Sequence, residues 1–80
     1  MWTVYILECG DGTYYTGITN DIDQRIQAHT EGTGARYTRG RGPFSLEYTE
    51  QCKDRSEATK RELSIKKLSR AEKLAIIKNH

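Results

Sequence analysis

The sequence predicts an α+β fold in which helices flank a small three-stranded antiparallel sheet, in the order β-β-α-β-α-α. Two short apolar runs joined by a glycine-containing turn indicate a hairpin, and a third, alternating run indicates another strand. The chain after residue 53 follows a helical pattern, and too few helices lie between the strands for a doubly wound parallel sheet. With 80 residues there is room for one domain, spanning residues 1–80, with one hydrophobic core.

The predicted hairpin consists of strands Thr3–Cys9 and Thr13–Thr19, which are rich in β-branched and aromatic residues. Residues 10–12 join them. Because side chains alternate between the two faces of a strand, the length of this loop decides which tyrosines share a face. A two-residue turn would place Tyr5 and Tyr15 on opposite faces.

We predict a three-residue loop instead, with Gly12 in the left-handed conformation. In that register Tyr5 lies opposite Gly17, whose missing side chain leaves room beside the phenol. The hydroxyl groups of Tyr5 and Tyr15 can then approach one site, while Tyr14 points to the other face and into the core.

The first helix and the third strand are separated by a long loop. Asn20 is the predicted N-cap of a helix that fades near Thr30. Residues 31–43 are rich in glycine and contain the only proline, which indicates a loop, and loops of this length are often functional or mobile. Alternating apolar and polar residues in Phe44–Thr49 predict a half-buried third strand.

The helical pattern at the end of the chain divides into two segments. It begins at Asp54 and pauses after Leu68. Ser69, followed three residues later by Glu72, forms a capping box that starts a helix again.

The net charge of +2 is unevenly distributed along the chain. Residues 1–30 carry one Arg against four acids, whereas residues 53–80 carry nine Lys or Arg against four acids. Such asymmetry suits an anionic partner, of which nucleic acid is the commonest. A solvated basic helical face explains the composition equally well.

Nothing in the sequence indicates a membrane or a secretory route. No run approaches the length of a membrane span, and no basic start leads into an apolar stretch. Cys9 and Cys52 form neither a CxxC pair nor a disulfide framework. We therefore expect a cytoplasmic protein.

Two polar positions stand out on the predicted helices. Arg25 and His29 are four residues apart and so lie on one helical face. Glu62 falls in a stripe with Ala58 and Ile65, so a carboxylate interrupts the side of the helix that faces the core. The plainer interpretation of the first pair is an exposed arginine and a histidine that caps the helix.

Four segments of the chain carry a family resemblance, namely TVYIL, YYTGI, DIDQRIQAH and ATKRELSIKKL. Together they resemble the GIY-YIG nuclease domain over almost the whole chain. The two half-motifs correspond to Thr3-Val4-Tyr5 and Tyr15-Thr16-Gly17. Thr3 replaces the first glycine of the motif and Thr16 replaces the middle isoleucine. The stretch from the histidine through RYTR to GP is similar to the small stand-alone members of that family.

The resemblance implies an endonuclease that hydrolyses phosphodiester bonds of nucleic acid, DNA rather than RNA, in DNA repair or processing. Tyr5 is the leading candidate for the general base toward the attacking water, with its pKa lowered by Arg25 and a nearby base. Tyr15 would orient the water or the phosphate, and Arg25 would stabilise charge in the transition state. His29 would assist the tyrosine, bind phosphate or only cap the helix, and whether Tyr5 or His29 takes the first proton is left open.

Glu62 is the expected metal ligand. The resemblance implies that it binds a single Mg²⁺ or Mn²⁺, and Mg²⁺ commonly takes one or two carboxylates and keeps several waters. The structural alternative is a buried salt bridge from Glu62 to Arg25 or Arg61.

Further residues are expected to contact nucleic acid. Guanidinium groups mixed with an aromatic ring in the glycine-rich loop suit phosphates and unpaired bases, and lysines near the end of the chain suit a phosphate backbone. The residues expected to do so are Gly17, Arg36, Tyr37, Arg39, Arg41, Lys66 and Lys67.

Two other classes of function compete with the nuclease. One is a catalytically weak or inactive module that binds nucleic acid, with a protein partner supplying specificity. The other is a small protein-interaction domain, which leaves Glu62 and Arg25 unexplained. The sequence does not define the oligomeric state.

Overall fold

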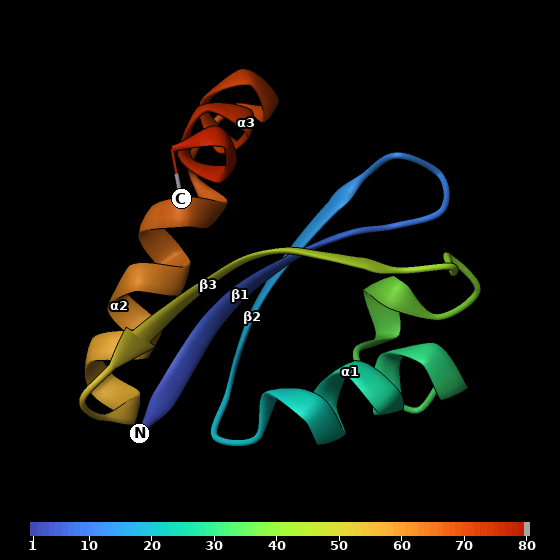
Figure 1. Ribbon diagram of the computed structural model, residues 1–80, viewed down its shortest axis with the longest axis horizontal. Coiled ribbons are helices and arrows are strands. Elements are labelled where there is room, and N and C mark those ends of the chain that lie inside the picture. Colours follow the sequence, from blue (N-terminus) through green and yellow to red (C-terminus); the bar gives the residue numbers. More distant parts are fainter. Residues whose placement is uncertain (80) are drawn as a thin grey trace.

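The computed structural model of the protein describes residues 1–79 and has the predicted order of strands and helices (Figure 1). A three-stranded antiparallel sheet has the strand order β2-β1-β3. The elements are β1 (Trp2–Glu8), β2 (Tyr14–Thr19), α1 (Ile22–Glu31), the short 3₁₀ helix η1 (Arg36–Thr38), β3 (Ser45–Cys52), α2 (Arg55–Lys66) and α3 (Arg70–Lys78).

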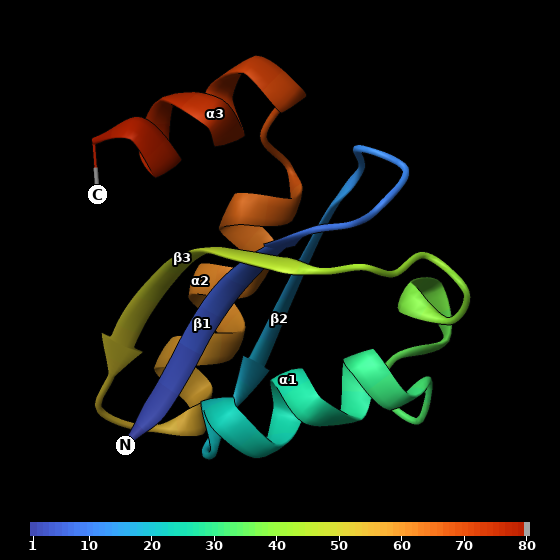
Figure 2. The same cartoon turned by 45° about the vertical axis from the view of Figure 1, so that its right-hand side comes forward.

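The helices lie on both sides of the sheet. In Figure 2, helix α2 runs behind the strands and α1 lies below them, at the end of β2. The alternation of β1 sends Val4 and Ile6 toward α2, and sends Tyr5 and Leu7 toward the side of α1. The hydrophobic core on the α2 side consists of Val4, Ile6, Tyr48, Cys52, Ala58 and Ile65.

The hairpin has the predicted three-residue loop. The backbone N–H of Cys9 donates to the carbonyl of Thr13 at 2.8 Å, and Gly12 has a φ of 84°. Tyr5 lies opposite Gly17 in the ladder, which confirms the predicted register. A Cβ added to Gly17 would lie 2.6 Å from the Tyr5 Oη, so only glycine fits against this phenol.

The start of α1 differs from the prediction by one residue. Asp21, not Asn20, is the N-cap, because its carboxylate accepts from the N–H of Gln24 at 3.2 Å. The Thr19 hydroxyl oxygen accepts from the N–H of Asp21 at 3.0 Å, which leaves Asn20 in the turn between strand and helix. The capping box that was predicted at the start of α3 is present in full.

Strand β3 is longer than predicted and contains an irregularity. It pairs with all of β1, from Cys52 opposite Trp2 to Ser45 opposite Glu8. Tyr48 lies opposite Ile6, but the next residue of β1, Leu7, lies opposite Leu46, so β3 has one extra residue between these two pairs. The extra residue breaks the alternation, so Leu46 is 45% exposed whereas Tyr48 is buried, and the prediction that both would lie on the buried face is wrong for Leu46.

Among residues 1–79, no helix is long and apolar enough to cross a membrane.

Candidate active site

Four of the predicted site residues, Tyr5, Tyr15, Arg25 and His29, lie together in the structure. This tyrosine is completely buried, and its Oη lies 2.8 Å from Nε2 of His29. The Nε of Arg25 donates to the same oxygen at 3.4 Å. The ring of Tyr15 lies 5.3 Å from that of His29 and 6.3 Å from that of Tyr5, measured between centroids. The structure therefore brings together residues from β1, β2 and α1.

Thr38 determines the tautomer of His29. The Thr38 hydroxyl donates to the carbonyl of Ala35 at 2.9 Å, so its oxygen is available to accept from His29 Nδ1 at 2.7 Å. A histidine that donates through Nδ1 and stays neutral has a free lone pair on Nε2. Nε2 of His29 therefore accepts the hydroxyl proton of Tyr5.

The neutral state of His29 has a physical cause. Its side chain is almost fully buried, and burial together with the positive charge of Arg25 lowers the pKa of His29 below its ordinary value of 6.5. At neutral pH the imidazole is thus a base that already holds a hydrogen bond from Tyr5.

The pKa of Tyr5 changes in the opposite direction from the prediction. Burial raises it to about 12, and the hydrogen bond from Arg25 lowers it by less than burial raises it. Arg25 acts in the predicted direction, but the prediction of a lowered pKa for Tyr5 is wrong, since desolvation of the phenolate outweighs the nearby cation. Tyr5 is a protonated phenol at neutral pH, and it can take a proton only as it passes its own to His29.

The glycine-rich loop closes over His29. A Cβ added to Gly34 would lie 2.6 Å from His29 Nδ1, and the ring of Phe44 lies 6.0 Å from the imidazole. Sequence reasoning missed Thr38, Gly34 and Phe44 as neighbours of the site. Thr38 is a small polar residue nine positions after the histidine, which is a weak signal in the sequence. Its role becomes clear only from the path of the loop, which brings its hydroxyl to His29 Nδ1.

Glu62 lies beside this cluster on α2. Its side chain is 17% exposed, and its ion pair is with Lys66 on the next turn, at 3.6 Å between Nζ and Oε2. Arg61, an alternative partner considered from the sequence, is paired with Glu50 at 3.0 Å instead. The pKa of Tyr5, which burial raises most, is raised further by the charge of Glu62, so this carboxylate lies within electrostatic reach of the tyrosine.

The donor groups suit a divalent cation held by one carboxylate. Among the described residues, no group of three or more His, Cys, Asp or Glu side chains surrounds a common point. Mg²⁺ is commonly bound by one or two carboxylates, with waters and substrate phosphates as its other ligands. A partly buried Glu62 beside the tyrosine cluster fits that pattern, whereas a cage built wholly of protein ligands does not.

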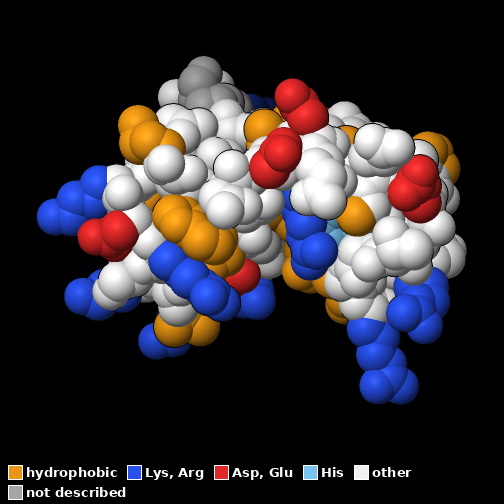
Figure 3. Space-filling view, turned by 90° about the horizontal axis from the view of Figure 1, so that it is seen from below, with side chains coloured by type: hydrophobic (Ala, Val, Ile, Leu, Met, Phe, Trp, Pro, Cys, Tyr) orange, Lys and Arg blue, Asp and Glu red, His pale blue; other side chains and the backbone are white. Residues whose placement is uncertain are grey.

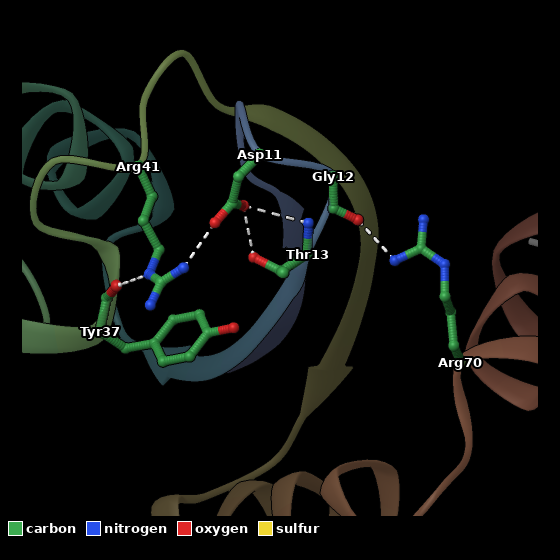
Figure 4. A network of polar contacts seen from close by, with 6 residues as sticks. All are labelled: Asp11, Gly12, Thr13, Tyr37, Arg41 and Arg70. Carbon is green, nitrogen blue, oxygen red and sulfur yellow. Dashed lines mark hydrogen bonds and ion pairs between the residues drawn. The ribbon is translucent and has the colours of Figure 1, made fainter.

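Some of the residues predicted to contact nucleic acid are exposed to solvent, and one is already paired within the protein. Arg36, Arg39 and Tyr37 are exposed on the loop, and Tyr37 stacks on Tyr15 with 5.8 Å between ring centroids. Arg41 is engaged within the protein, because Nη1 contacts Asp11 Oδ2 at 2.5 Å. Figure 4 shows this arginine between the hairpin loop and Tyr37.

The hairpin loop holds the surrounding segments together. Arg41 Nε donates to the carbonyl of Tyr37 at 2.7 Å, and its guanidinium lies 4.4 Å from the centroid of that ring. On the other side, Arg70 at the start of α3 donates to the carbonyl of Gly12 at 2.5 Å (Figure 4). The glycine-rich loop and α3 are therefore both tied to one turn.

Basic side chains are spread around the molecule. Lys66 and Lys67, at the end of α2, are both exposed. Figure 3 shows Lys and Arg side chains at several places along one face, including both sides of a notch on its lower edge. This distribution is compatible with a partner that carries many negative charges.

A buried tyrosine-histidine pair, an adjacent arginine and a carboxylate on the following helix agree with the family that the motifs resemble. The family model described as the GIY-YIG catalytic domain matches residues 1–75. The chain therefore belongs to the GIY-YIG family, which is a family of nucleases.

The relatives of this chain are small proteins designated UPF0213. One from Halobacterium salinarum is 54% identical over 76 residues, which cover 95% of this chain and 99% of the relative. One from Desulfotalea psychrophila is 55% identical over 78 residues, which cover 96% of this chain and 71% of the relative.

Solved structures show the same fold. The solution NMR structure of the UPF0213 protein BH0048 from Bacillus halodurans has a TM-score of 0.62 and 49% identity, covering 98% of this chain and 84% of that one. The solution NMR structure of protein EF2693 from E. faecalis has a TM-score of 0.66 and 42% identity, covering 96% of this chain and 82% of that one.

Proposed function

We propose that the protein is a divalent-metal-dependent endonuclease that hydrolyses phosphodiester bonds in DNA, within DNA repair or processing. The observation that supports this most is the hydroxyl of Tyr5, which lies between a neutral histidine and an arginine. A hydroxyl that can hand its proton to His29 while taking one from water is suited to activate a nucleophile.

The proton passes from water to Tyr5 and from Tyr5 to His29. As the water oxygen attacks phosphorus, one of its protons moves to the Tyr5 oxygen and the phenolic proton moves to His29 Nε2. His29 becomes an imidazolium that still donates through Nδ1 to Thr38. The bond from phosphorus to the 3′-oxygen breaks, and the leaving oxygen takes a proton from solvent water. The products carry a 3′-hydroxyl and a 5′-phosphate, and His29 returns its extra proton to solvent.

Arg25 has two tasks in this scheme. Tyr5 is 0% exposed, so water can reach its hydroxyl only after a covering side chain moves. Arg25 is partly exposed. The hydrogen bond with Tyr5 raises the pKa of its guanidinium most, and Tyr15 raises it further. A guanidinium that turns from Tyr5 to a bound phosphate would uncover the hydroxyl and also neutralise charge that develops on the phosphoryl oxygens.

Glu62 would hold the metal ion. The ion, when bound, supplies positive charge that stabilises the leaving oxygen. Lys66 pairs with the same carboxylate, so a metal ion held by Glu62 would leave this lysine free to face the substrate.

The complete burial of Tyr5 also favours a second candidate function. A protein whose tyrosine never becomes accessible would bind nucleic acid without cutting it, and would act with a partner.

Incubation with labelled DNA separates the two. Single-stranded, duplex and branched DNA, and RNA of the same sequence, are incubated with the protein in Mg²⁺, in Mn²⁺ and in EDTA. We expect metal-dependent cutting of DNA that is lost in Glu62→Gln and retained in Glu31→Gln, which removes an exposed charge at the end of α1. Removing a preorganised charge costs on the order of 10²–10³ in rate. Salt-sensitive binding without any product supports the second function.

A further inference from the structure

A groove of about 290 Å³ lies beside the edge strand β2, next to the tyrosine cluster. Its lining combines aromatic, hydroxyl and cationic side chains, namely Tyr14, Tyr15, Thr16, Tyr37, Lys66 and Lys73. We infer that this groove holds one unpaired nucleotide beside the bond that is cut, so that the substrate is single-stranded or locally unpaired DNA. This inference rests on the proposed function and names its substrate.

The size of the groove suits one nucleotide. Sites for small ligands typically have volumes of about 300–1,000 Å³, and this groove lies at the lower end. A single base with its sugar can enter such a space, whereas a base pair within a duplex cannot leave its stack to do so without losing its pairing.

One wall of the groove is aromatic. Tyr15 and Tyr37 lie with their rings 23° from parallel, and Tyr37 remains 43% exposed. Arg41 holds the Tyr37 backbone and ring in place through its contacts with Asp11 and the Tyr37 carbonyl. A fixed, partly exposed aromatic surface can contact a base of any sequence, because every base has a π-face.

Another part of the lining is cationic. Lys66 and Lys73 come from two different helices, α2 and α3, and both line the groove. Helix α3 is held toward the hairpin by Arg70, which donates to the Gly12 carbonyl and lies 4.8 Å from the centroid of the Tyr14 ring. The phosphate of a nucleotide in the groove would therefore meet two ammonium groups.

The groove adjoins the proposed site of cleavage on two sides. Tyr15 belongs to both, since its ring packs against His29 and also lines the groove. Lys66 belongs to both as well, through its ion pair with Glu62. A nucleotide in the groove is thus the immediate neighbour of a phosphate placed between Arg25 and Glu62.

Thr16 adds a polar group with no structural use within the described chain. The residue is 3% exposed, and its Oγ1 is buried without a hydrogen-bond partner among residues 1–79. Buried polar groups are normally paired. Rotation about χ1 moves the hydroxyl to another staggered position, from which it can bond to a base or sugar in the groove. Thr16 stands where the resembled motif has isoleucine, which could not do this.

Equilibrium binding in EDTA tests the inference without any cutting. The anisotropy of one labelled sequence is measured as a single strand and as a duplex. We expect the single strand to bind at least about tenfold more tightly, and Tyr37→Ala to weaken only the single strand, by about tenfold, since stacking on an aromatic ring is worth about that much or more. Equal affinity for the two forms, or a Tyr37→Ala variant that binds like the parent protein, overturns the inference.

Two further variants probe the other walls. Thr16→Val should weaken binding of the single strand severalfold without lowering the melting temperature, because the lost hydroxyl has no partner. Substituting Lys66 and Lys73 together by Gln should reduce the salt slope by about 0.7, the value for one neutralised phosphate on a single strand, whereas the same change at Lys53 and Lys60 should leave the slope unchanged. A lower melting temperature with unchanged binding in Thr16→Val, or equal slopes for the two lysine pairs, overturns the inference.

The same assays separate this inference from the nuclease activity. Selective binding of single strands without metal-dependent cutting supports the groove and refutes the nuclease. Cutting that is as fast on an intact duplex as on a single strand supports the nuclease and refutes the groove. The absence of binding to any nucleic acid refutes both.

Discussion

The hydroxyl of Tyr5 on the central strand lies 2.8 Å from Nε2 of His29 on the first helix, and the two residues are 24 positions apart in the chain. The hairpin loop determines on which face the tyrosine lies, and the glycine-rich loop determines the tautomer of the histidine. Proton transfer between these atoms therefore depends on two loops that themselves carry no reacting group.

Removing the partner of His29 Nδ1 should impair the proton transfer without removing a reacting atom. In Thr38→Val the Nδ1–H loses its acceptor, so the Nδ1-protonated tautomer is no longer favoured. We expect the cleavage rate to fall on the order of 10–100-fold, the range found when a metal-bound histidine loses its orienting partner. Nitrogen NMR of the imidazole reports the tautomer directly. A Thr38→Val protein that keeps both the tautomer and the rate would contradict the scheme.

The rate of cleavage should depend on the protonation of His29. Burial and then the charge of Arg25 lower the pKa of His29 below 6.5, and only the neutral imidazole can accept the proton of Tyr5. The single-turnover rate should therefore rise with pH through a midpoint below about 6.5 and be level above it. A midpoint above that value, or a rate that falls between neutral and mildly alkaline pH, would refute this assignment.

The same histidine should make folding sensitive to acid. Because its pKa is lower in the folded protein, the unfolded chain binds a proton that the folded chain does not. The contribution of His29 to stability is therefore complete above about pH 6.5 and is lost as the pH falls toward the folded-state pKa. Thermal melting across this range should show a decline that is smaller in His29→Gln. An equal decline in both proteins would assign the acid sensitivity to other groups.

Gly17 should tolerate no side chain. A Cβ there would lie 2.6 Å from Tyr5 Oη and 3.0 Å from the Tyr15 ring, so Gly17→Ala forces the phenols apart. We expect a loss of about 1–3 kcal/mol in the free energy of unfolding, which is typical of overpacking, and loss of cleavage. Denaturant titration measures the free energy of unfolding. The matched control is Gly42→Ala, where the added Cβ lies 3.6 Å from its nearest neighbour and should cost less. Equal stability of the two variants would contradict the close approach.

Arg41 should behave differently from its neighbour Arg39. Arg41 is already paired with Asp11, whereas Arg39 is exposed. Replacing Arg39 by Gln should therefore lower the salt slope of single-strand binding by about 0.7, and replacing Arg41 should leave the slope nearly unchanged. The ion pair is itself partly exposed, so Arg41→Gln should cost no more than about 1 kcal/mol of stability. A reduced slope in Arg41→Gln would restore its predicted role as a phosphate contact.

Local sequence rules were sufficient for much of the framework. The register of Tyr5 against Gly17 follows from the length of a glycine loop, and the capping box at Ser69 follows from Glu72 three residues later. The spacing of Arg25 and His29 placed them on one helical face, and the structure points both at the same hydroxyl.

The errors concern effects that depend on tertiary packing. The pKa of Tyr5 could not be predicted from the presence of Arg25, because its direction depends on how deeply the phenol is buried. Asp11 lies 30 positions from Arg41, and no local pattern predicts that ion pair. The exposure of Leu46 depends on an irregularity in β3 that only pairing with β1 reveals.

Single-turnover cleavage by Tyr5→Phe tests the central claim most directly. The substitution keeps the ring in its packed position and removes only the hydroxyl between His29 and Arg25. We expect the rate to fall by about 10²–10⁴, the range of a general acid or base, with DNA affinity unchanged. Tyr48→Phe, which removes a tyrosine hydroxyl from the core on the other side of the sheet, should cut at the parent rate. Cleavage by Tyr5→Phe within about tenfold of the parent rate would contradict the account.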